Sequence, residues 1–298
     1  MPVVYRPARE HELERAEQLV VQSINDLTQR HGFGKMASLR PAHFQQFSLR
    51  DDPEGLWIAE DNGEILGFAF SWVCGDLWFL AELFVAPGQQ GRGIGNELLA
   101  RTLAHAGKNK AAHKALITFA FNTVSQGLYI QHGLLPRLPL SFFKVSRDVL
   151  QARLQDSEIR HASLEATDLQ HLSDIDAHAL GISREKHHRY LMSDAGMKGF
   201  LLRSGDERIG YVYVNPDGHI GPLAVTRRDA MGQAFQAALK LAAEQGAAQV
   251  TAFIPGTSDA ALKAAIDHGM RITFPMLLMS SNDFGDWNCY LPRNPGFM

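Results

Sequence analysis

The sequence predicts an α/β protein made of two similar domains, and three observations point to it. Strand-like stretches of alternating or apolar residues are interleaved with stretches of helical periodicity along the chain. The order of these stretches in the first half returns in the second half, which indicates a repeat of domain size. A length of 298 residues suits two domains of ordinary size.

Periodicity and turn residues define the elements of the first half. Apolar side chains at helical spacing predict a helix over residues 10–29. The Asn62-Gly63 pair between two strand-like stretches predicts a tight hairpin. In order, the predicted elements are a strand at 3–6, helices at 10–29 and 42–47, a hairpin of 57–59 and 65–73, a strand at 77–85, a helix at 96–106, a strand at 115–121, a helix at 124–132 and a strand at 140–145.

A polar stretch at residues 146–158 separates the halves and is the predicted connector. The predicted domains are therefore 1–147 and 158–298. The second half is expected to contain strands at 159–161, 200–202, 209–214, 221–225, 250–254 and 271–279, with helices at 166–178, 230–244 and 259–268. The repeat is supported by three matched segments, which are 66–70 with 209–213, 83–85 with 223–225, and 132–134 with 268–270.

Composition excludes several classes of protein. The formal net charge is -3, so the chain lacks the positive surface that grips nucleic acid. No apolar run reaches the roughly 20 residues of a membrane span, and the N-terminus has no signal-peptide pattern. Cys74 and Cys289 are too few for a disulfide framework or a zinc cluster. A cytoplasmic protein without metal, nucleic-acid or membrane partners is expected, as a monomer or a homodimer.

A glycine-rich loop carries the strongest chemical signal. It has the spacing Gly91-x-Gly93-x-Gly95, follows the strand that ends at Val85, and precedes a helix. Backbone N–H groups at such a helix start are unpaired and the helix dipole is positive there, which suits a pyrophosphate. The loop fits neither a Walker motif nor a dinucleotide fingerprint. The alternative is a turn without a ligand.

Two motifs in the first half resemble those of the GNAT family of acetyl-CoA-dependent N-acetyltransferases. In the loop, Gln90, Gly93 and Gly95 occupy the family positions Gln/Arg-x-x-Gly-x-Gly/Ala, after a Val-x-Pro segment. Residues 122–134 are similar to the second signature, Asn-x-x-Ala-x-x-Phe/Leu-Tyr-x-x-x-Gly-Phe, with Ser125 and Leu134 as mild departures. The resemblance covers residues 1 to 146. It implies two tandem GNAT-like domains, each a twisted mixed sheet flanked by helices.

The resemblance also implies roles for individual residues. Tyr129 would protonate the leaving thiolate, and Asn122 would bind the pantetheine arm or orient Tyr129. A backbone N–H of the strand segment before the loop would receive the developing oxyanion. The residues implied to bind acetyl-CoA are Leu83, Phe84, Val85, Gln90, Gly91, Arg92, Gly93, Ile94, Gly95 and Asn122.

Glu82 is the candidate general base, because it immediately precedes the segment at 83–85. A carboxylate there would deprotonate an amine through water or attract a cation, and the alternative is a solvated strand carboxylate. Diamine acetyltransferases carry paired acids at this place. Here Ala81 stands beside Glu82.

The second half departs from the pattern. It lacks Gly-x-Gly, has Asp229 in its loop, and has Ala265 where the first half has Tyr129. It is similar to a degenerate GNAT domain. The charged run at 184–189 is expected to be a solvated face, with an anion contact as the alternative. Residues 287–298 are expected to form an extended strap.

These features predict an N-acetyltransferase that transfers the acetyl group of acetyl-CoA to a small primary amine by direct attack. Two alternatives stay open at this point. One is a CoA-binding regulatory or partner-binding module without turnover. The other is an acetyltransferase of protein N-termini or lysines.

Overall fold

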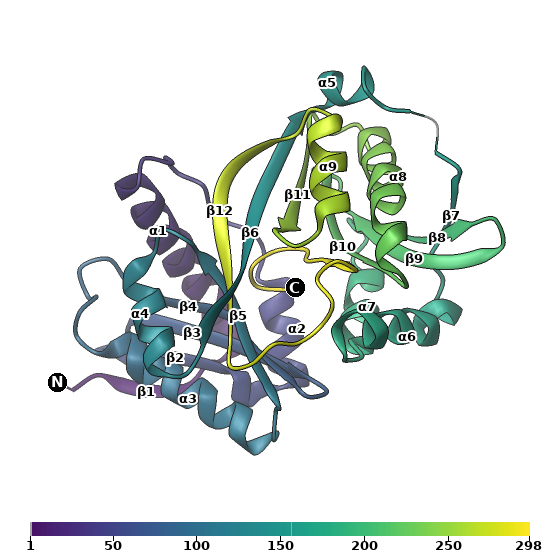
Figure 1. Ribbon diagram of the computed structural model, residues 1–298. Helices are drawn as coiled ribbons and strands as arrows, with labels where there is room; N and C mark the ends of the chain where they lie inside the picture. The colour runs from purple at the N-terminus through teal and green to yellow at the C-terminus, as the bar shows by residue number, and fades with distance from the viewer. Residues whose placement is uncertain (1, 156) are drawn as a thin grey trace. The chain divides into compact units, whose positions relative to one another are not determined.

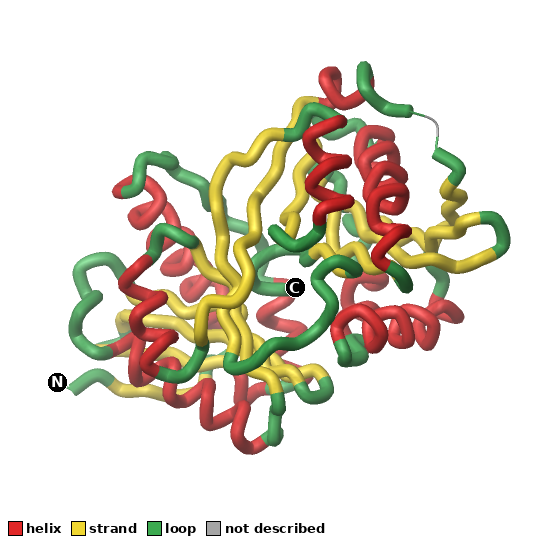
Figure 2. The backbone as a smooth tube through the Cα atoms, in the orientation of Figure 1, coloured by secondary structure: helices red, strands yellow, loops and turns green. Residues whose placement is uncertain are grey.

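The computed structural model describes residues 2–155 and 157–298, and contacts divide the chain into two compact units. Unit 1 comprises Met1–Pro136 and Met279–Asn282, and unit 2 comprises Arg137–Leu278 and Asp283–Met298. Each unit is α/β, with strands that form a sheet and helices that flank it (Figures 1 and 2). The predicted α/β fold class is confirmed.

Unit 1 contains a mixed sheet in the order β1-β2-β3-β4-β5. All neighbours in it are antiparallel except β4 and β5, which are parallel. Met279–Asn282 lies beside β5, where the Ser281 N–H donates to the Lys114 carbonyl at 2.9 Å. The elements are β1 (Val4–Pro7), α1 (Leu13–Arg30), α2 (His43–Asp51), β2 (Leu56–Asp61), β3 (Glu64–Cys74), β4 (Leu77–Val85), α3 (Ile94–Lys108), β5 (His113–Phe119) and α4 (Thr123–Gln131).

The two faces of this sheet carry different helices. On one face, Ala69 of β3 packs against Ile94 and Leu98 of α3. On the other face, Phe70 of β3 meets Phe44 of α2 edge-on, with ring centroids 5.4 Å apart. The hairpin between β2 and β3 turns on Asn62 and Gly63, both with positive φ, as the sequence predicts.

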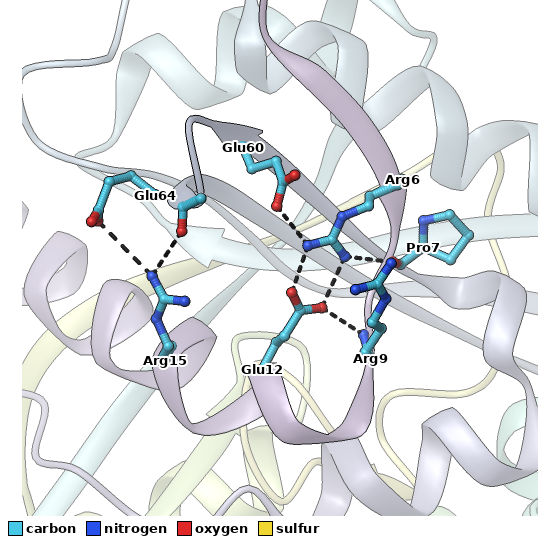
Figure 3. A network of polar contacts seen from close by, with 8 residues as sticks. Arg6, Pro7, Arg9, Glu12, Arg15, Glu60 and Glu64 are labelled. Atoms are coloured by element: carbon cyan, nitrogen blue, oxygen red, sulfur yellow. Dashed lines mark hydrogen bonds and ion pairs between the residues drawn. The ribbon is translucent and has the colours of Figure 1, made fainter.

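An ion-pair network fixes the N-terminal edge of unit 1 (Figure 3). Arg6 of β1 donates to Glu12 at 2.9 Å and to Glu60 of β2 at 2.6 Å. The Arg6 hydrogen bonds hold the pKa of Glu12 below its usual value. On the next turn, Arg15 of α1 donates to the Gly63 carbonyl at 3.0 Å. These contacts hold the start of α1 against the β2–β3 hairpin.

Unit 2 has the strand order β7-β8-β9-β10-β11-β6-β12, and β13 pairs with β10. The sequence assigns the strand at 140–145 to the first domain, whereas by contacts it lies in unit 2, because β6 pairs with β11 from Leu140 to Ser146. The elements are β6 (Leu135–Ser146), α5 (Arg147–Gln151), β7 (Ile159–Ser163), α6 (Leu169–Leu180), α7 (Glu185–Ser193), β8 (Lys198–Ser204), β9 (Glu207–Val214), β10 (His219–Val225), α8 (Met231–Glu244), β11 (Gln249–Pro255), α9 (Asp259–Asp267), β12 (Arg271–Ser280) and β13 (Tyr290–Leu291).

The charged run at 184–189 is a solvated face only in part. Glu185 and Arg189 lie on the surface and pair with each other, whereas Arg184, His187 and His188 are buried, contrary to the prediction. Arg184 is 1% exposed, and its guanidinium donates to Asp176 of α6 at 3.0 Å and to Tyr211 of β9 at 3.0 Å. A ring nitrogen of His188 lies 3.0 Å from the same Asp176 carboxylate. Burial by itself would raise the pKa of Asp176, but Arg184 and His188 hold it well below its usual value. Arg184 and the two histidines therefore face inward at the start of α7, and Asp176 neutralises the charge of Arg184 within the core of unit 2.

The described residues, 2–155 and 157–298, contain neither of two features that would point to a membrane or to a metal ion. Within them, no helix has both the length and the apolar character needed to cross a membrane. Nor do three or more His, Cys, Asp or Glu side chains there gather in a way that would hold a metal ion.

Candidate active site

Strands β4 and β5 of unit 1 separate partway along their length. Their parallel pairing extends from Leu77 opposite His113 to Leu80 opposite Leu116. Beyond that point β4 continues to Val85, held by β3 on its other side. Among the described residues, the edge of β4 that faces β5 has no strand partner over 81–85. Backbone groups along such an edge are available to a ligand.

A β-bulge decides the direction of Glu82. Leu80 pairs with Ser71 and Glu82 pairs with Phe70, so Ala81 is the extra residue between them. The bulge shifts the alternation of side chains by one, which places Glu82 on the Phe70 face of the sheet. That face is covered by α1 and α2.

Two further side chains meet Glu82 there, and sequence reasoning missed both. The amide nitrogen of Gln45, on α2, lies 3.1 Å from Glu82 Oε1 and 3.2 Å from Glu17 Oε2 of α1. Glu82 Oε2 is enclosed and has no hydrogen-bond partner in the part of the chain that the structure describes. Burial and then the charge of Glu17 raise the pKa of Glu82 to about 8, against the hydrogen bond from Gln45. The sequence does contain an indication that Glu17 is turned inward. It lies one turn from Leu13 and from Val20, on the apolar side of a helix.

The glycine loop has the backbone geometry that requires glycine. Gly88, Gly91 and Gly93 have φ of 84°, 80° and 80°, a region that other residues rarely adopt. A Cβ built at any of the three meets no atom within 4 Å, so the loop is open on those sides. Backbone conformation, rather than crowding within the protein, therefore requires glycine at these positions.

The loop ends at the uncapped start of α3. Gly93 is the N-cap, and no side chain caps the first turn. The N–H groups of Ile94, Gly95 and Asn96 consequently have no acceptor within the helix. The Ile94 side chain is buried in the core with Ala69 and Leu98, so this residue faces the loop through its backbone alone.

The side chains of the loop brace the loop itself. Gln90 donates to the Val85 carbonyl at 3.2 Å, and buried Ser23 of α1 donates to the same oxygen at 3.3 Å. Arg92 is exposed, and its guanidinium donates to Gln89. The predicted loop residues thus lie together at the end of β4.

Helix α4 lies against the start of α3. A Cβ at Gly95 would be 3.7 Å from Leu128, and a ring nitrogen of His132 is 2.8 Å from Asn96 Oδ1. Asn122 caps α4, since its Oδ1 accepts the Ser125 N–H at 3.3 Å. Its amide also donates to the Ser125 hydroxyl at 2.8 Å.

Tyr129 is 5% exposed, and burial raises the pKa of its hydroxyl. That hydroxyl makes no hydrogen bond among the described residues and is not fully enclosed. It therefore stays protonated at neutral pH and has a free donor. No hydrogen bond joins it to Asn122 or to Glu82 in the described part of the chain.

A Ser–His–Asp arrangement in unit 1 is structural. A ring nitrogen of His105 lies 2.9 Å from Asp52 Oδ1, and the other lies 3.3 Å from the Ser71 hydroxyl. Ser71 has no exposed surface and donates to the Gly55 carbonyl at 3.3 Å. A hydroxyl that no substrate reaches is not a nucleophile, so the arrangement ties the segment before β2 to α3.

In unit 2, the edge of β10 that corresponds to the open edge of β4 is occupied. Strand β10 pairs with β11 at His219 and Ile220, and then with β13 at Leu223 and Ala224. The Val225 N–H donates to the Cys289 carbonyl at 2.9 Å. The C-terminal segment therefore forms a short strand that covers this edge of β10.

Comparison with known proteins agrees with this geometry. Residues 21–134 match the model of the family described as Acetyltransferase (GNAT) family. The uncharacterized N-acetyltransferase YhfO of Bacillus subtilis (strain 168) is 34% identical over 96 residues, which are 30% of this chain. The chain spans 64% of the length of that relative.

Solved structures share the fold over nearly the whole chain. A putative acetyltransferase from Pyrococcus horikoshii has a TM-score of 0.78 at 19% identity, covering 99% of this chain and 96% of its own. A tandem GNAT protein from the clavulanic acid biosynthesis pathway has a TM-score of 0.63 at 14% identity, covering 94% of this chain and 98% of its own.

The fold is thus the one shared by these solved structures, which include a tandem GNAT protein, and the predicted fold class is confirmed. Residues 21–134 form an acetyltransferase domain of the GNAT family.

Proposed function

We propose that unit 1 transfers the acetyl group of acetyl-CoA to a small primary amine by direct attack. The observation that carries this proposal is Glu82, a base with one unpaired oxygen beside the open edge of β4. GNAT membership of residues 21–134 supports acyl transfer in general. The choice of a small amine rests on the surroundings of Glu82.

The residues of unit 1 fit acetyl-CoA. The loop from Gln90 to Gly95 is open at Gly91 and Gly93 and leads into an uncapped helix start, which suits a pyrophosphate. Along the free edge of β4 at Leu83–Val85, backbone groups other than the Val85 carbonyl, which already accepts from Gln90 and Ser23, can meet the pantetheine arm and the thioester oxygen. Acetyl-CoA supplies the activated acetyl group and leaves as a thiol.

The chain's own groups then handle the protons. An alkylammonium has a pKa near ~10, so it must lose a proton before it attacks. The ionised Glu82 carboxylate takes that proton, and the amine forms the new C–N bond while the C–S bond breaks. Tyr129 donates its hydroxyl proton to the leaving sulfur, and the proton that the nitrogen then loses restores Tyr129 through solvent.

Release of free CoA in the presence of a panel of primary amines tests the proposal. The full chain should turn over at least one amine, and Tyr129→Phe should lower kcat by roughly 10²–10⁴-fold with acetyl-CoA affinity kept. Tyr5→Phe, on β1, is the matched control and should act as wild type. Binding of acetyl-CoA without turnover would indicate a CoA-binding module instead, and turnover on peptides alone would indicate a protein acetyltransferase.

A further inference from the structure

Glu17 and Glu82 come from different elements and share one hydrogen-bond donor. The Gln45 amide nitrogen lies 3.2 Å from Glu17 Oε2 and 3.1 Å from Glu82 Oε1. Gln45 is 9% exposed, so this bridge is enclosed under α2. The two carboxyl groups are therefore held close together at the face of the sheet that α1 and α2 cover.

The pair lacks a cation. Among the described residues, no Lys, Arg or His nitrogen lies within 4.0 Å of either carboxylate. Arg40 acts on Glu17 from a distance, and its effect is smaller than that of burial, which raises the pKa of Glu17. Two half-buried carboxyl groups close together without a counter-charge are unfavourable unless a ligand brings one.

One enclosed oxygen of the pair has no donor among the described residues. Gln45 uses its amide on Glu82 Oε1, and Glu82 Oε2 stays enclosed and unpartnered. Buried carboxylate oxygens in proteins are almost always hydrogen-bonded. An ammonium group, with its several N–H donors and its positive charge, would satisfy Oε2 and the pair's missing counter-charge together.

The wall beside the pair is aromatic. Phe70 is directly opposite Glu82 in the β3–β4 register, and Phe44 meets Phe70 edge-on at 5.4 Å. Phe47 stacks on Phe44 one turn further along α2, with centroids 6.3 Å apart. Such rings favour the apolar stem of an amine and tolerate its cationic end, but offer nothing to a carboxylate.

We propose that Glu17 and Glu82 together form an ammonium-binding subsite, and that Glu17 selects acceptors that are cationic amines without a carboxylate beside the amino group. This inference rests on the proposed function and names its substrate class. Glu82 removes the proton, whereas Glu17 keeps its negative charge and attracts the incoming cation. An α-amino acid places its own carboxylate against this pair and is repelled.

Two pairs of probes isolate the carboxylate. Butylamine and 2-aminopentanoate differ by that group alone, as do 2-phenylethylamine and phenylalanine. Wild type should prefer the amine in each pair. Glu17→Gln should lower kcat/KM for the amines by about 10-fold, since hydrogen-bonded charges contribute at least that much, and should leave the amino acids nearly unchanged. The ratio of kcat/KM for each amine to that for its matching amino acid should therefore fall about 10-fold.

Glu14→Gln is the matched control, because Glu14 is an exposed glutamate on the same helix. It should keep both rates within twofold of wild type. Glu17→Asp keeps the charge and should retain much of the preference. Unchanged acetyl-CoA affinity in each variant shows that the fold is intact.

The outcomes separate the two proposals. If wild type acetylates amines and Glu17→Gln lowers all rates equally, Glu17 is structural and the inference is overturned while the proposed function stands. If wild type acetylates no amine, the proposed function fails, and calorimetric titration with butylammonium still tests the subsite. Binding to wild type that Glu17→Gln loses would support it, and absence of binding to wild type would overturn it.

Discussion

The protonation of Glu82 depends on residues that are distant in sequence. Glu17 is 65 positions away and Gln45 is 37 positions away, yet both act on the same carboxyl group. With a pKa of about 8, Glu82 is largely neutral at pH 7 when the subsite is empty. A cation that enters would favour the ionised form, which is the form that accepts a proton.

The raised pKa predicts how stability depends on pH. In the unfolded chain the pKa of Glu82 is 4.5, whereas in the folded chain it is about 8. The contribution of Glu82 to the free energy of unfolding is therefore at its full value below about pH 4.5, and it is lost as the pH rises toward the folded pKa. Glu82→Gln removes this dependence. The free energy of unfolding of the variant, relative to that of wild type, should therefore rise by roughly 1–3 kcal/mol when the pH is raised from 5.5 to 7.5.

Urea unfolding at the two pH values measures this difference. Glu17, whose pKa burial also raises, is present in both proteins, so the comparison measures Glu82 together with its interaction with Glu17. Glu14→Gln, which changes an exposed glutamate, should show no such gain. An equal stability difference at both pH values would mean that Glu82 is ionised in the folded protein throughout this range.

At the scale of elements, the start of α3 depends on one backbone conformation. Gly93 caps the helix with φ of 80°, and a side chain in this region costs roughly 1–2 kcal/mol. Gly93→Ala is therefore expected to shift the first turn of α3. Acetyl-CoA affinity should fall about tenfold or more, because the N–H groups at the helix start move.

Gly107 provides the control for that substitution. It lies near the other end of the same helix, its φ is not positive, and a Cβ there meets nothing within 4 Å. Gly107→Ala should raise stability by about 0.4–1 kcal/mol and leave acetyl-CoA binding unchanged. Calorimetry measures the acetyl-CoA affinity of both variants, and denaturant unfolding measures their stability. Equal acetyl-CoA affinity in the two variants would exclude a role for the Gly93 conformation.

At the scale of the whole molecule, the two units differ in whether the corresponding strand edge is paired. The edge of β4 is free in the described residues, whereas that of β10 is paired with β13. In unit 2 the segment before α8 has no glycine at its cap, where Ala230 has right-handed helical backbone angles. Ala265 occupies the position in α9 that Tyr129 occupies in α4, since each lies three residues before the His at the helix end.

One acetyl-CoA should therefore bind per chain. Calorimetric titration of the full chain is expected to give a stoichiometry near one, and Gly93→Ala should weaken that single site. A stoichiometry near two, with the second site unaffected by Gly93→Ala, would mean that β13 leaves β10 and that unit 2 binds the cosubstrate as well.

The sequence was sufficient for features that depend on neighbouring residues. The Asn62-Gly63 turn and the glycine loop before α3 follow from local backbone preferences, which any fold must respect. The motif containing Tyr129 lies on one short helix, so its spacing is visible in the chain itself. Glu82 was found because it adjoins such a motif.

Tertiary structure alone decided the features that join distant segments. The bulge at Ala81 and the packing of α1 and α2 bring Glu17 and Gln45 to Glu82, and no local pattern encodes such a meeting. Burial of Arg184 was likewise unforeseen, because a charged residue is buried only when a partner such as Asp176 is supplied from elsewhere. Local sequence thus determined the backbone shapes of this protein, whereas long-range packing determined which charges meet inside it.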